Sequence, residues 1–334
     1  MENGSGQLPL IFNVIKENIL TYGNPLGLRP ESLADWNHKI KLPNKGKTLI
    51  YSGGEHQLIP YLNHLTKVIT RLETEGKTFS LMVGAGKFLN RLGLSLDKVY
   101  GSLLNGEQKR FEDVPFKAAA ILKNMGTDLC FLGEEELYSG ALLFEMGYIE
   151  ELKGYAGKVA TQIESTGASE VVCLSPHTVE LFRDAYKNLL GGFNIDVYSF
   201  SEYLVKHLDP SQLITSGKQT ILTIHDPCRL TRDSNIAEET RQFFTTFPGV
   251  DLREPVNCKE WTSCCGGPIK MVFPELAHMI SRRRLSDLTA TGAELVLTFC
   301  PYCLASFVKN NKEERPVKIV DFIEFIYGRM TNAQ

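Results

Sequence analysis

Five cysteines in the C-terminal third of the chain have a spacing that suits a soft-metal cofactor. Cys228 is followed by the adjacent pair Cys264 and Cys265, and then by Cys300 and Cys303, which gives the pattern C-x35-C-C-x34-C-x2-C. Each stands at the end of an apolar run or in a loop rich in Gly and Pro (HDPC, SCCGGP, FCPYC). Thiolates bind soft metals, and iron–sulfur clusters take nearly all of their protein ligands from Cys. We therefore expect these five residues to hold a cluster.

Two other interpretations of the five cysteines compete with this one. Free cysteines often pack as small, inert hydrophobic residues, and a structural zinc takes four ligands, usually as two short-spaced pairs. This chain offers one C-x2-C pair and one adjacent pair. The side chains of neighbouring residues diverge, so Cys264 and Cys265 reach different atoms of a multinuclear cluster more easily than a single zinc ion. A fifth thiol also exceeds what one zinc needs, so the cluster is preferred.

Polar residues flank the first of these cysteines. His225 and Asp226 precede Cys228, and Arg229 and Arg232 follow it. In one interpretation, His225 is a proton source and Arg232 a charge partner beside a substrate thiolate. In the other, Asp226 caps a loop and the arginines are exposed bases. The sequence alone leaves both interpretations open.

The remaining cysteines have simpler expectations. Cys258 lies six residues before Cys264 and is either a redox residue near the cluster or, as we prefer, a packed thiol. Cys130 and Cys173 stand inside apolar β-type runs and are predicted to be core residues. Disulfides are not expected, because the chain is large and six of its eight cysteines fall in its last third.

Short β-type runs alternate with helical patterns along the chain. This order is typical of parallel sheets covered by helices on both faces, so the sequence predicts an α/β fold. The β-type runs are 48–52, 79–83, 128–132, 170–175, 195–200, 220–225, 294–299 and 318–322. Helical periodicity marks residues 59–75, 148–166, 179–190 and 274–291. The first 45 residues are predicted to form an arm with one amphipathic helix at about 10–21.

The chain also contains an internal repeat. Residues 167–208 align with 292–330, since both contain Gly-Ala, an apolar strand, x-Pro-x, a helix, a second strand and a short helix. The match extends upstream, where 133–147 aligns with 261–275 and 50–58 with 224–232. We therefore expect an N-terminal arm (1–45), a first repeat (46–210) and a second repeat that binds the cluster (211–334).

The two repeats differ at the thiols. Every cysteine of the five has a different residue at the aligned position of the first repeat. Gly54 stands for Cys228, Tyr138 and Ser139 for Cys264 and Cys265, and Ser175 and Thr178 for Cys300 and Cys303. This pattern indicates a duplication followed by loss of the first site.

The motifs HDPCRLTR, SCCGGP and FCPYC, with the echoes GEEE-x-x-x-G and SPH, resemble the cysteine-rich CCG-domain family over about residues 46–330. Its best-known member is the B-type component of heterodisulfide reductase. The resemblance implies two Rossmann-like βα halves related by pseudo-two-fold symmetry. It further implies that a complete CCG motif holds a noncubane [4Fe-4S] cluster with five cysteines. In this chain those ligands would be Cys228, Cys264, Cys265, Cys300 and Cys303, with one cluster per chain.

The resemblance also implies an iron–sulfur oxidoreductase subunit of a heterodisulfide-reductase-like complex. It would act on a small disulfide, a persulfide or a protein-bound thiol, or relay electrons in sulfur metabolism. The chain lacks the C-x2-C-x2-C-x3-C-P run of cubane ferredoxins. The partners implied are a ferredoxin-like C-type subunit and a flavin-containing A-type subunit. Alternatives are an electron-transfer subunit of a lactate or glycolate oxidation system and a zinc-stabilised scaffold.

Composition adds limits to these expectations. The 334 residues are enough for two domains, and a formal charge of −3 gives no reason to expect nucleic acid as a partner. No uncharged apolar run reaches about 18–20 residues, so no membrane span is expected. The N-terminus lacks the apolar core of a signal peptide, and we predict a cytoplasmic location.

Overall fold

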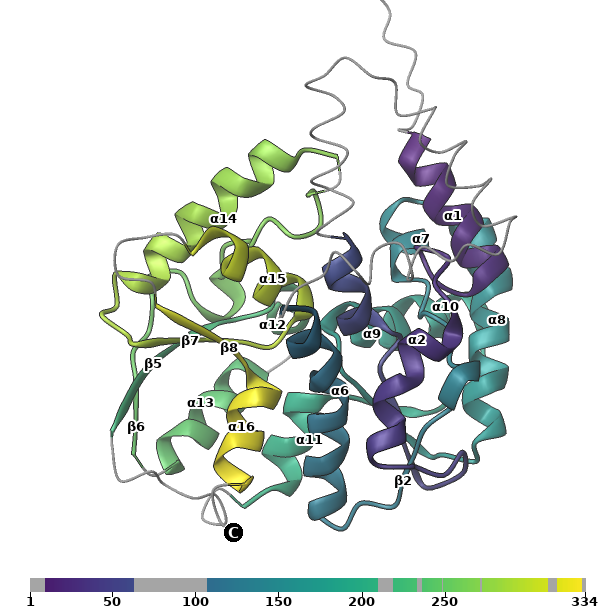
Figure 1. The fold of residues 1–334 in the computed structure, drawn as a ribbon, viewed down its shortest axis with the longest axis horizontal. Helices are drawn as coiled ribbons and strands as arrows, with labels where there is room; N and C mark the ends of the chain where they lie inside the picture. The colour runs from purple at the N-terminus through teal and green to yellow at the C-terminus, as the bar shows by residue number, and fades with distance from the viewer. Residues whose placement is uncertain are drawn as a thin grey trace, which may run out of the picture.

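Two parallel sheets of four strands each form the framework of the computed structural model (Figure 1). The first contains β1 (Thr48–Tyr51), β2 (Leu129–Cys130), β3 (Glu170–Cys173) and β4 (Asp196–Ser199), and the second contains β5 (Thr220–His225), β6 (Val250–Leu252), β7 (Leu295–Thr298) and β8 (Lys318–Asp321). The structure describes residues 10–62, 107–209, 219–232, 236–247, 249–270, 272–311 and 317–331. The predicted α/β class is confirmed.

The strands follow one order in both sheets. The first sheet runs β2-β1-β3-β4 and the second β6-β5-β7-β8, with every neighbouring pair parallel. A shared strand order is what a duplication would produce. Whether the halves are Rossmann-like and related by a pseudo-two-fold axis stays a prediction. In each sheet the chain switches sides at the central strand, β1 or β5, and ligands of open parallel sheets bind at the carboxyl ends of the strands at such a point.

Each predicted β-type run within the described residues contains an observed strand. The run 79–83 and most of the predicted helix 59–75 lie outside them. One strand, β6, was not predicted, because it has only three residues and an aspartate at its centre.

Helices surround both sheets. The predicted helices 148–166 and 274–291 are α8 (Ile149–Ser165) and α14 (Pro274–Thr289), whereas 179–190 is covered by α9 (Pro176–Glu180), a π-helical turn (Leu181–Ala185) and α10 (Tyr186–Leu190). The other helices are α1 (Leu10–Tyr22), α2 (Pro30–Ala34), α6 (Glu107–Asn124), α7 (Ala141–Glu145), α11 (Phe200–His207), α12 (Cys228–Thr231), α13 (Ile236–Thr246), α15 (Pro301–Asn310) and α16 (Phe322–Thr331), with 3-10 turns η1 (Asp35–Lys39), η2 (Gly133–Glu135) and η5 (Lys259–Trp261). None of the described helices is both long and apolar enough to cross a membrane.

The predicted N-terminal helix packs into the core of the first half. In α1, Ile15 and Ile19 are buried and belong to the same apolar cluster as Tyr51 of β1 and Leu152 of α8. The segment therefore contributes to the stability of the first half.

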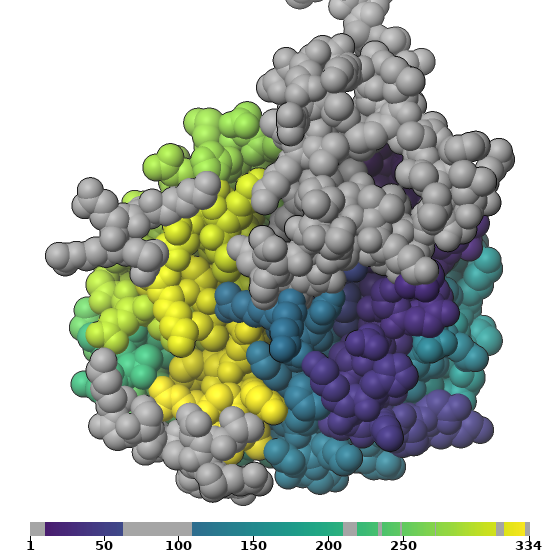
Figure 2. All heavy atoms as spheres, in the orientation of Figure 1, coloured from purple at the N-terminus to yellow at the C-terminus, as the bar shows by residue number. Residues whose placement is uncertain are grey.

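A second apolar cluster spans both halves. It joins Ile50 and Val172 of the first sheet to Leu222 and Leu297 of the second. Helices α6, α11 and α16 lie between the two sheets (Figure 1), and the surface of α6, in blue, meets that of α16, in yellow (Figure 2). The two halves therefore share part of their hydrophobic core, while the domain boundaries drawn from the repeat stay a prediction.

Candidate metal centre

The five cysteines come from three loops that follow neighbouring strands. Cys228 begins α12 just after β5, and Cys300 is the N-cap of α15 just after β7. Cys264 and Cys265 lie between η5 and α14, in the segment that follows β6. The carboxyl ends of parallel strands meet at one edge of a sheet, so the order β6-β5-β7 brings these loops together.

The five thiols form a continuous chain of contacts. The Sγ atoms of Cys265 and Cys303 are 3.1 Å apart. Cys264 contacts both Cys228 and Cys265, and Cys300 contacts Cys303. The thiols of Cys265, Cys300 and Cys303 are buried, whereas Cys228 and Cys264 are partly exposed. The structure therefore gathers the whole predicted set, and its open side is at Cys228 and Cys264.

Backbone N–H groups point at two of the sulfurs. Gly266 N donates to Cys264 Sγ (3.3 Å), and Gly267 N donates to Cys265 Sγ (3.4 Å). Gly266 has φ +79°, and a Cβ there would lie 2.5 Å from the carbonyl oxygen of Ala277. Only glycine fits this position, and it allows the amide to approach the sulfur. Such donors suit an anionic, sulfur-rich group.

The ionisation of the thiols supports the same conclusion. Contacts with Cys228 and Cys265 lower the pKa of Cys264. Burial opposes ionisation of Cys300, but Cys303 and His177 lower the pKa of Cys300 below its usual value. The contact with Cys264 in turn raises the pKa of Cys228. Thiols packed this closely cannot all be thiolates unless positive charge is bound among them, so the donor set fits an iron–sulfur cluster.

His225 lies beside the thiols. The ligand atoms of His225, Cys265 and Cys303 lie within 4.8 Å of one another. Arg284 Nε donates to His225 Nδ1 (3.2 Å), and burial together with Arg284 lowers the pKa of His225 to about 3. The imidazole is therefore neutral with an accepting Nδ1. Its role as a proton source stays a prediction. Its position beside Cys265 and Cys303 would allow it to contact the sulfurs.

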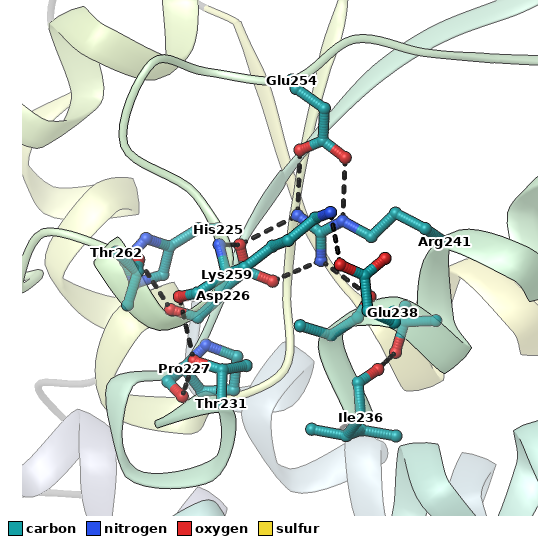
Figure 3. Close-up of polar contacts among 12 residues, drawn as sticks. His225, Asp226, Pro227, Thr231, Ile236, Glu238, Arg241, Glu254, Lys259 and Thr262 are labelled. Atoms are coloured by element: carbon teal, nitrogen blue, oxygen red, sulfur yellow. Dashed lines mark hydrogen bonds and ion pairs between the residues drawn. The ribbon is translucent and has the colours of Figure 1, made fainter. Parts of the chain in front are cut away.

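Asp226 is buried in an ion-pair network (Figure 3). Both of its carboxylate oxygens pair with Arg241, which also pairs with Glu254 through Nε (2.8 Å) and Nη2 (2.9 Å). Lys259 N donates to Asp226 Oδ2 (2.7 Å). Asp226 therefore connects the start of the Cys228 loop to Arg241 of α13 and to Lys259 of η5.

Arg232 and Cys258 are not gathered with the thiols. Arg232 is exposed at the end of α12. Cys258 is half-buried at the start of η5, where burial raises its pKa. The predicted catalytic roles of both stay predictions. Cys130 and Cys173 are buried core residues of β2 and β3, as expected.

Comparison with known proteins identifies the domain that carries the site. The model of the CCG family, described as a cysteine-rich domain, matches residues 222–308, which contain all five cysteines. The chain contains a cysteine-rich CCG domain. The matched range lies within the second half, which agrees with the loss of thiols from the first.

Three relatives show the range of proteins that are similar to this chain. A probable iron–sulfur-binding oxidoreductase, FadF, of Bacillus subtilis (strain 168) is 26% identical over 79% of this chain and 36% of its own length. The D-type component of the heterodisulfide reductase of Methanosarcina acetivorans is 29% identical over 56% of this chain and 48% of its own length. An EtfAB:quinone oxidoreductase of Syntrophomonas wolfei is 24% identical over 79% and 36%. The chain thus spans about a third to a half of the length of these relatives.

In the half opposite the CCG domain, hydroxyls and a carboxylate stand where thiols would be expected. Ser175 is the N-cap of α9 and precedes Pro176, just as Cys300 precedes Pro301 at α15. The carboxylate of Glu55 is fully buried and accepts from Ser175 Oγ and Thr178 Oγ1 (each 2.6 Å). Thr178 also bonds to Ser139 (2.9 Å).

Glu55 therefore occupies the place in the first half that corresponds to the thiol set. Its role could not be predicted from the sequence, because it lies one residue beyond Gly54, the position aligned with Cys228. The one signal was an acidic residue that follows the two glycines after an apolar strand.

Two further residues of the first half reach the CCG domain and were also missed. His177 Nδ1 lies 2.6 Å from Glu145 Oε1, and the ring contacts Cys300. Burial opposes protonation, but Glu145 and Cys300 raise the pKa of His177 well above its usual value. The signal in the sequence was the motif SPH, aligned with CPY.

A small cavity of about 50 Å³ lies between the two halves, beside the CCGGP loop. The first half lines it with apolar side chains and the Glu145–His177 pair. The CCG domain contributes Gly267, Pro268, Lys270, Tyr302 and Ala305. A ligand of a few atoms that enters here would lie next to the thiol set.

Proposed function

We propose that this chain is the iron–sulfur redox subunit of a heterodisulfide-reductase-like complex and an oxidoreductase that acts on sulfur groups. Cys228, Cys264, Cys265, Cys300 and Cys303 would hold one noncubane [4Fe-4S] cluster. The observation that carries the proposal is the continuous contact of the five thiols on a matched CCG domain. When bound, such a cluster supplies one-electron transfer next to sulfur.

The residues around the thiols have distinct tasks in this proposal. The N–H groups of Gly266 and Gly267 stabilise negative charge on the ligand sulfurs. The sulfur end of a small disulfide, a persulfide or a protein-bound thiol would enter the cavity beside them, with the first half forming its opposite wall. His225 is the candidate for contact with the sulfurs, while Arg232 and Cys258 are candidates for charge and thiol chemistry at the rim.

The resemblance to heterodisulfide reductase supports the partners that we propose. Electrons would pass between the cluster and a ferredoxin-like C-type subunit and a flavin-containing A-type subunit, in the cytoplasm. The two repeats, with boundaries near residues 45 and 210, would form pseudo-two-fold halves around the site.

Metal analysis of a Cys300→Ser variant tests the assignment. Anaerobically purified wild-type protein is expected to hold about four iron atoms and matching acid-labile sulfide per chain. Because Cys300 is buried among the thiols, its substitution should lower iron, sulfide and the EPR signal together. Cys130→Ser is the control, since Cys130 lies in β2 outside the thiol set.

Unchanged iron in Cys300→Ser would disprove the ligand assignment. Zinc without sulfide in the wild type would favour the zinc-stabilised scaffold instead.

A second function within the same family is an electron relay without a sulfur substrate. The similarity to a quinone oxidoreductase and to a probable iron–sulfur-binding oxidoreductase favours it. In this case the chain would pass electrons from a flavin partner, for example in lactate or glycolate oxidation. Turnover of a 2-hydroxy acid by the purified complex, with no turnover of disulfides or persulfides, would support this alternative.

A further inference from the structure

A histidine of the first half touches a candidate ligand of the second. His177 Nδ1 lies 2.6 Å from Glu145 Oε1, and the ring also contacts the Cys300 thiol. Because Nδ1 is engaged with Glu145, Nε2 is the nitrogen left for Cys300. The imidazole therefore lies between a carboxylate and a sulfur.

The surrounding residues hold the ring in this position. His177 is 8% exposed, and its ring centroid lies 4.8 Å from that of Tyr302, which neighbours the cysteines in α15. Arg229 Nη2 lies 3.3 Å from Glu145 Oε1, and Arg229 Nη1 lies 2.8 Å from Glu180 Oε2. Contacts therefore connect Arg229 of the CCG domain, through Glu145 and His177 of the first half, to Cys300 of the CCG domain.

The partners decide which hydrogen bonds the ring can make once Cys300 is a ligand. The carboxylate of Glu145 can only accept, so Nδ1 donates to it. A cysteine that binds a metal is a thiolate without a hydrogen, so its sulfur can also only accept. Nε2 must then donate to Cys300 once that residue is a ligand. Both requirements are met by a ring that carries two N–H groups.

We propose that His177 is a positioning residue that raises the reduction potential of the cluster by donating an N–H···S hydrogen bond to Cys300, and that Glu145 orients it. The inference rests on the proposed cluster. Hydrogen bonds to ligand sulfurs stabilise the more negative, reduced form and are a principal control of the potential. The first half, although it has no thiols at its aligned positions, thereby keeps a part in redox chemistry.

The test compares variants of the full-length, iron-loaded protein by EPR-monitored redox titration. His177→Phe keeps an aromatic ring but removes both donors, and we expect full iron content with a more negative midpoint potential. His177→Gln restores one N–H donor and should return part of the shift. Glu145→Gln weakens the hydrogen bond that orients the ring. It should therefore make the midpoint potential more negative, as His177→Phe does.

The control is Glu202→Gln. Glu202 pairs with Arg183 through two hydrogen bonds (2.9 and 2.8 Å) in the same half, but the thiols make no contact with this pair among the described residues. Its potential should equal that of the wild type.

The outcomes separate this inference from the proposed function. A wild-type protein without iron or sulfide would refute the cluster itself. A wild type with a full cluster, together with unchanged potentials in His177→Phe and Glu145→Gln, would overturn the role of His177 and leave the cluster standing. If His177→Phe fails to fold, Glu145→Gln and His177→Gln decide, and potentials equal to wild type in both would overturn the inference.

Discussion

At the scale of single residues, the loop that begins the thiol set depends on a buried ion pair. The side chains of Asp226 and Arg241 are 2% and 9% exposed. The same carboxylate accepts from Lys259 N, so it links the Cys228 loop to η5 (Figure 3). A buried pair of this kind contributes little net stability compared with apolar residues, but removal of one partner leaves an uncompensated charge.

Arg241→Met should therefore destabilise the protein strongly. We expect the free energy of unfolding to fall by about 3–5 kcal/mol, because Asp226 would be left buried without a counter-charge. Chemical denaturation followed by circular dichroism measures this loss. In the control, Arg253→Met breaks a pair whose side chains are 42% and 35% exposed, and its cost should stay below about 1 kcal/mol. Equal costs in the two variants would contradict the prediction.

At the scale of elements, the loop between η5 and α14 is held close to that helix. Gly266 has a left-handed backbone and directs its N–H at Cys264, while Ala277 of α14 occupies the space where a side chain would lie. The position of the thiol pair thus depends on how α14 packs against its own preceding loop.

A substitution at this glycine should disturb both the fold and the bound iron. Gly266→Ala would bring a Cβ within 2.5 Å of a backbone oxygen, so we expect a loss of more than about 2 kcal/mol in the free energy of unfolding. Bound iron per folded chain should also fall. Gly147 has a similar φ of +80° with no atom within 4 Å of an added Cβ. Gly147→Ala should therefore cost about 1 kcal/mol and leave the iron unchanged.

At the scale of the whole molecule, one buried residue of the first half is influenced by a charged group of the second. His56 is fully buried after the end of β1, and neither of its ring nitrogens has a hydrogen-bond partner among the described residues. The negative charge of Glu324 of α16, in the other half, favours protonation of His56 and so raises its pKa. Burial lowers the pKa of His56 from 6.5 to about 4 despite this carboxylate. The ring is therefore neutral in the folded protein at neutral pH.

This histidine predicts a loss of stability in mild acid. Between pH 6.5 and about 4 the unfolded chain binds a proton that folded His56 does not, so the free energy of unfolding decreases as the pH falls through this window. The contribution is at most about 3 kcal/mol. His56→Leu should flatten the profile in this window, whereas His207→Leu, at an exposed position, should not. Parallel profiles for wild type and His56→Leu would exclude this role.

The parts of this structure that could be predicted are those encoded by neighbouring residues. Apolar runs indicated the strands, and the short motifs HDPC, SCCGGP and FCPYC indicated the thiol set, because each of these signals lies within a few residues. Strand β6 was not predicted, because three half-buried residues with a central aspartate have no clear periodicity.

The contacts between the halves could not be predicted in this way. His177 meets Cys300, and Arg229 meets Glu145 across 84 positions of the sequence. Each of these residues looks like an ordinary surface or capping residue when its own segment is considered alone. Their roles depend on how two complete sheets pack together, which no local pattern encodes.

The carboxylate of Glu55 bears on whether the lost site could ever be regained in evolution. A lineage with cysteines at Ser139, Ser175 and Thr178 would have thiols around a buried carboxyl group and would lack the hydroxyls that donate hydrogen bonds to it. Each single reversion would thus be harmful until Glu55 had also changed. Under the duplication and loss that the sequence predicts, this polar cluster would make a return of thiols to the first half difficult.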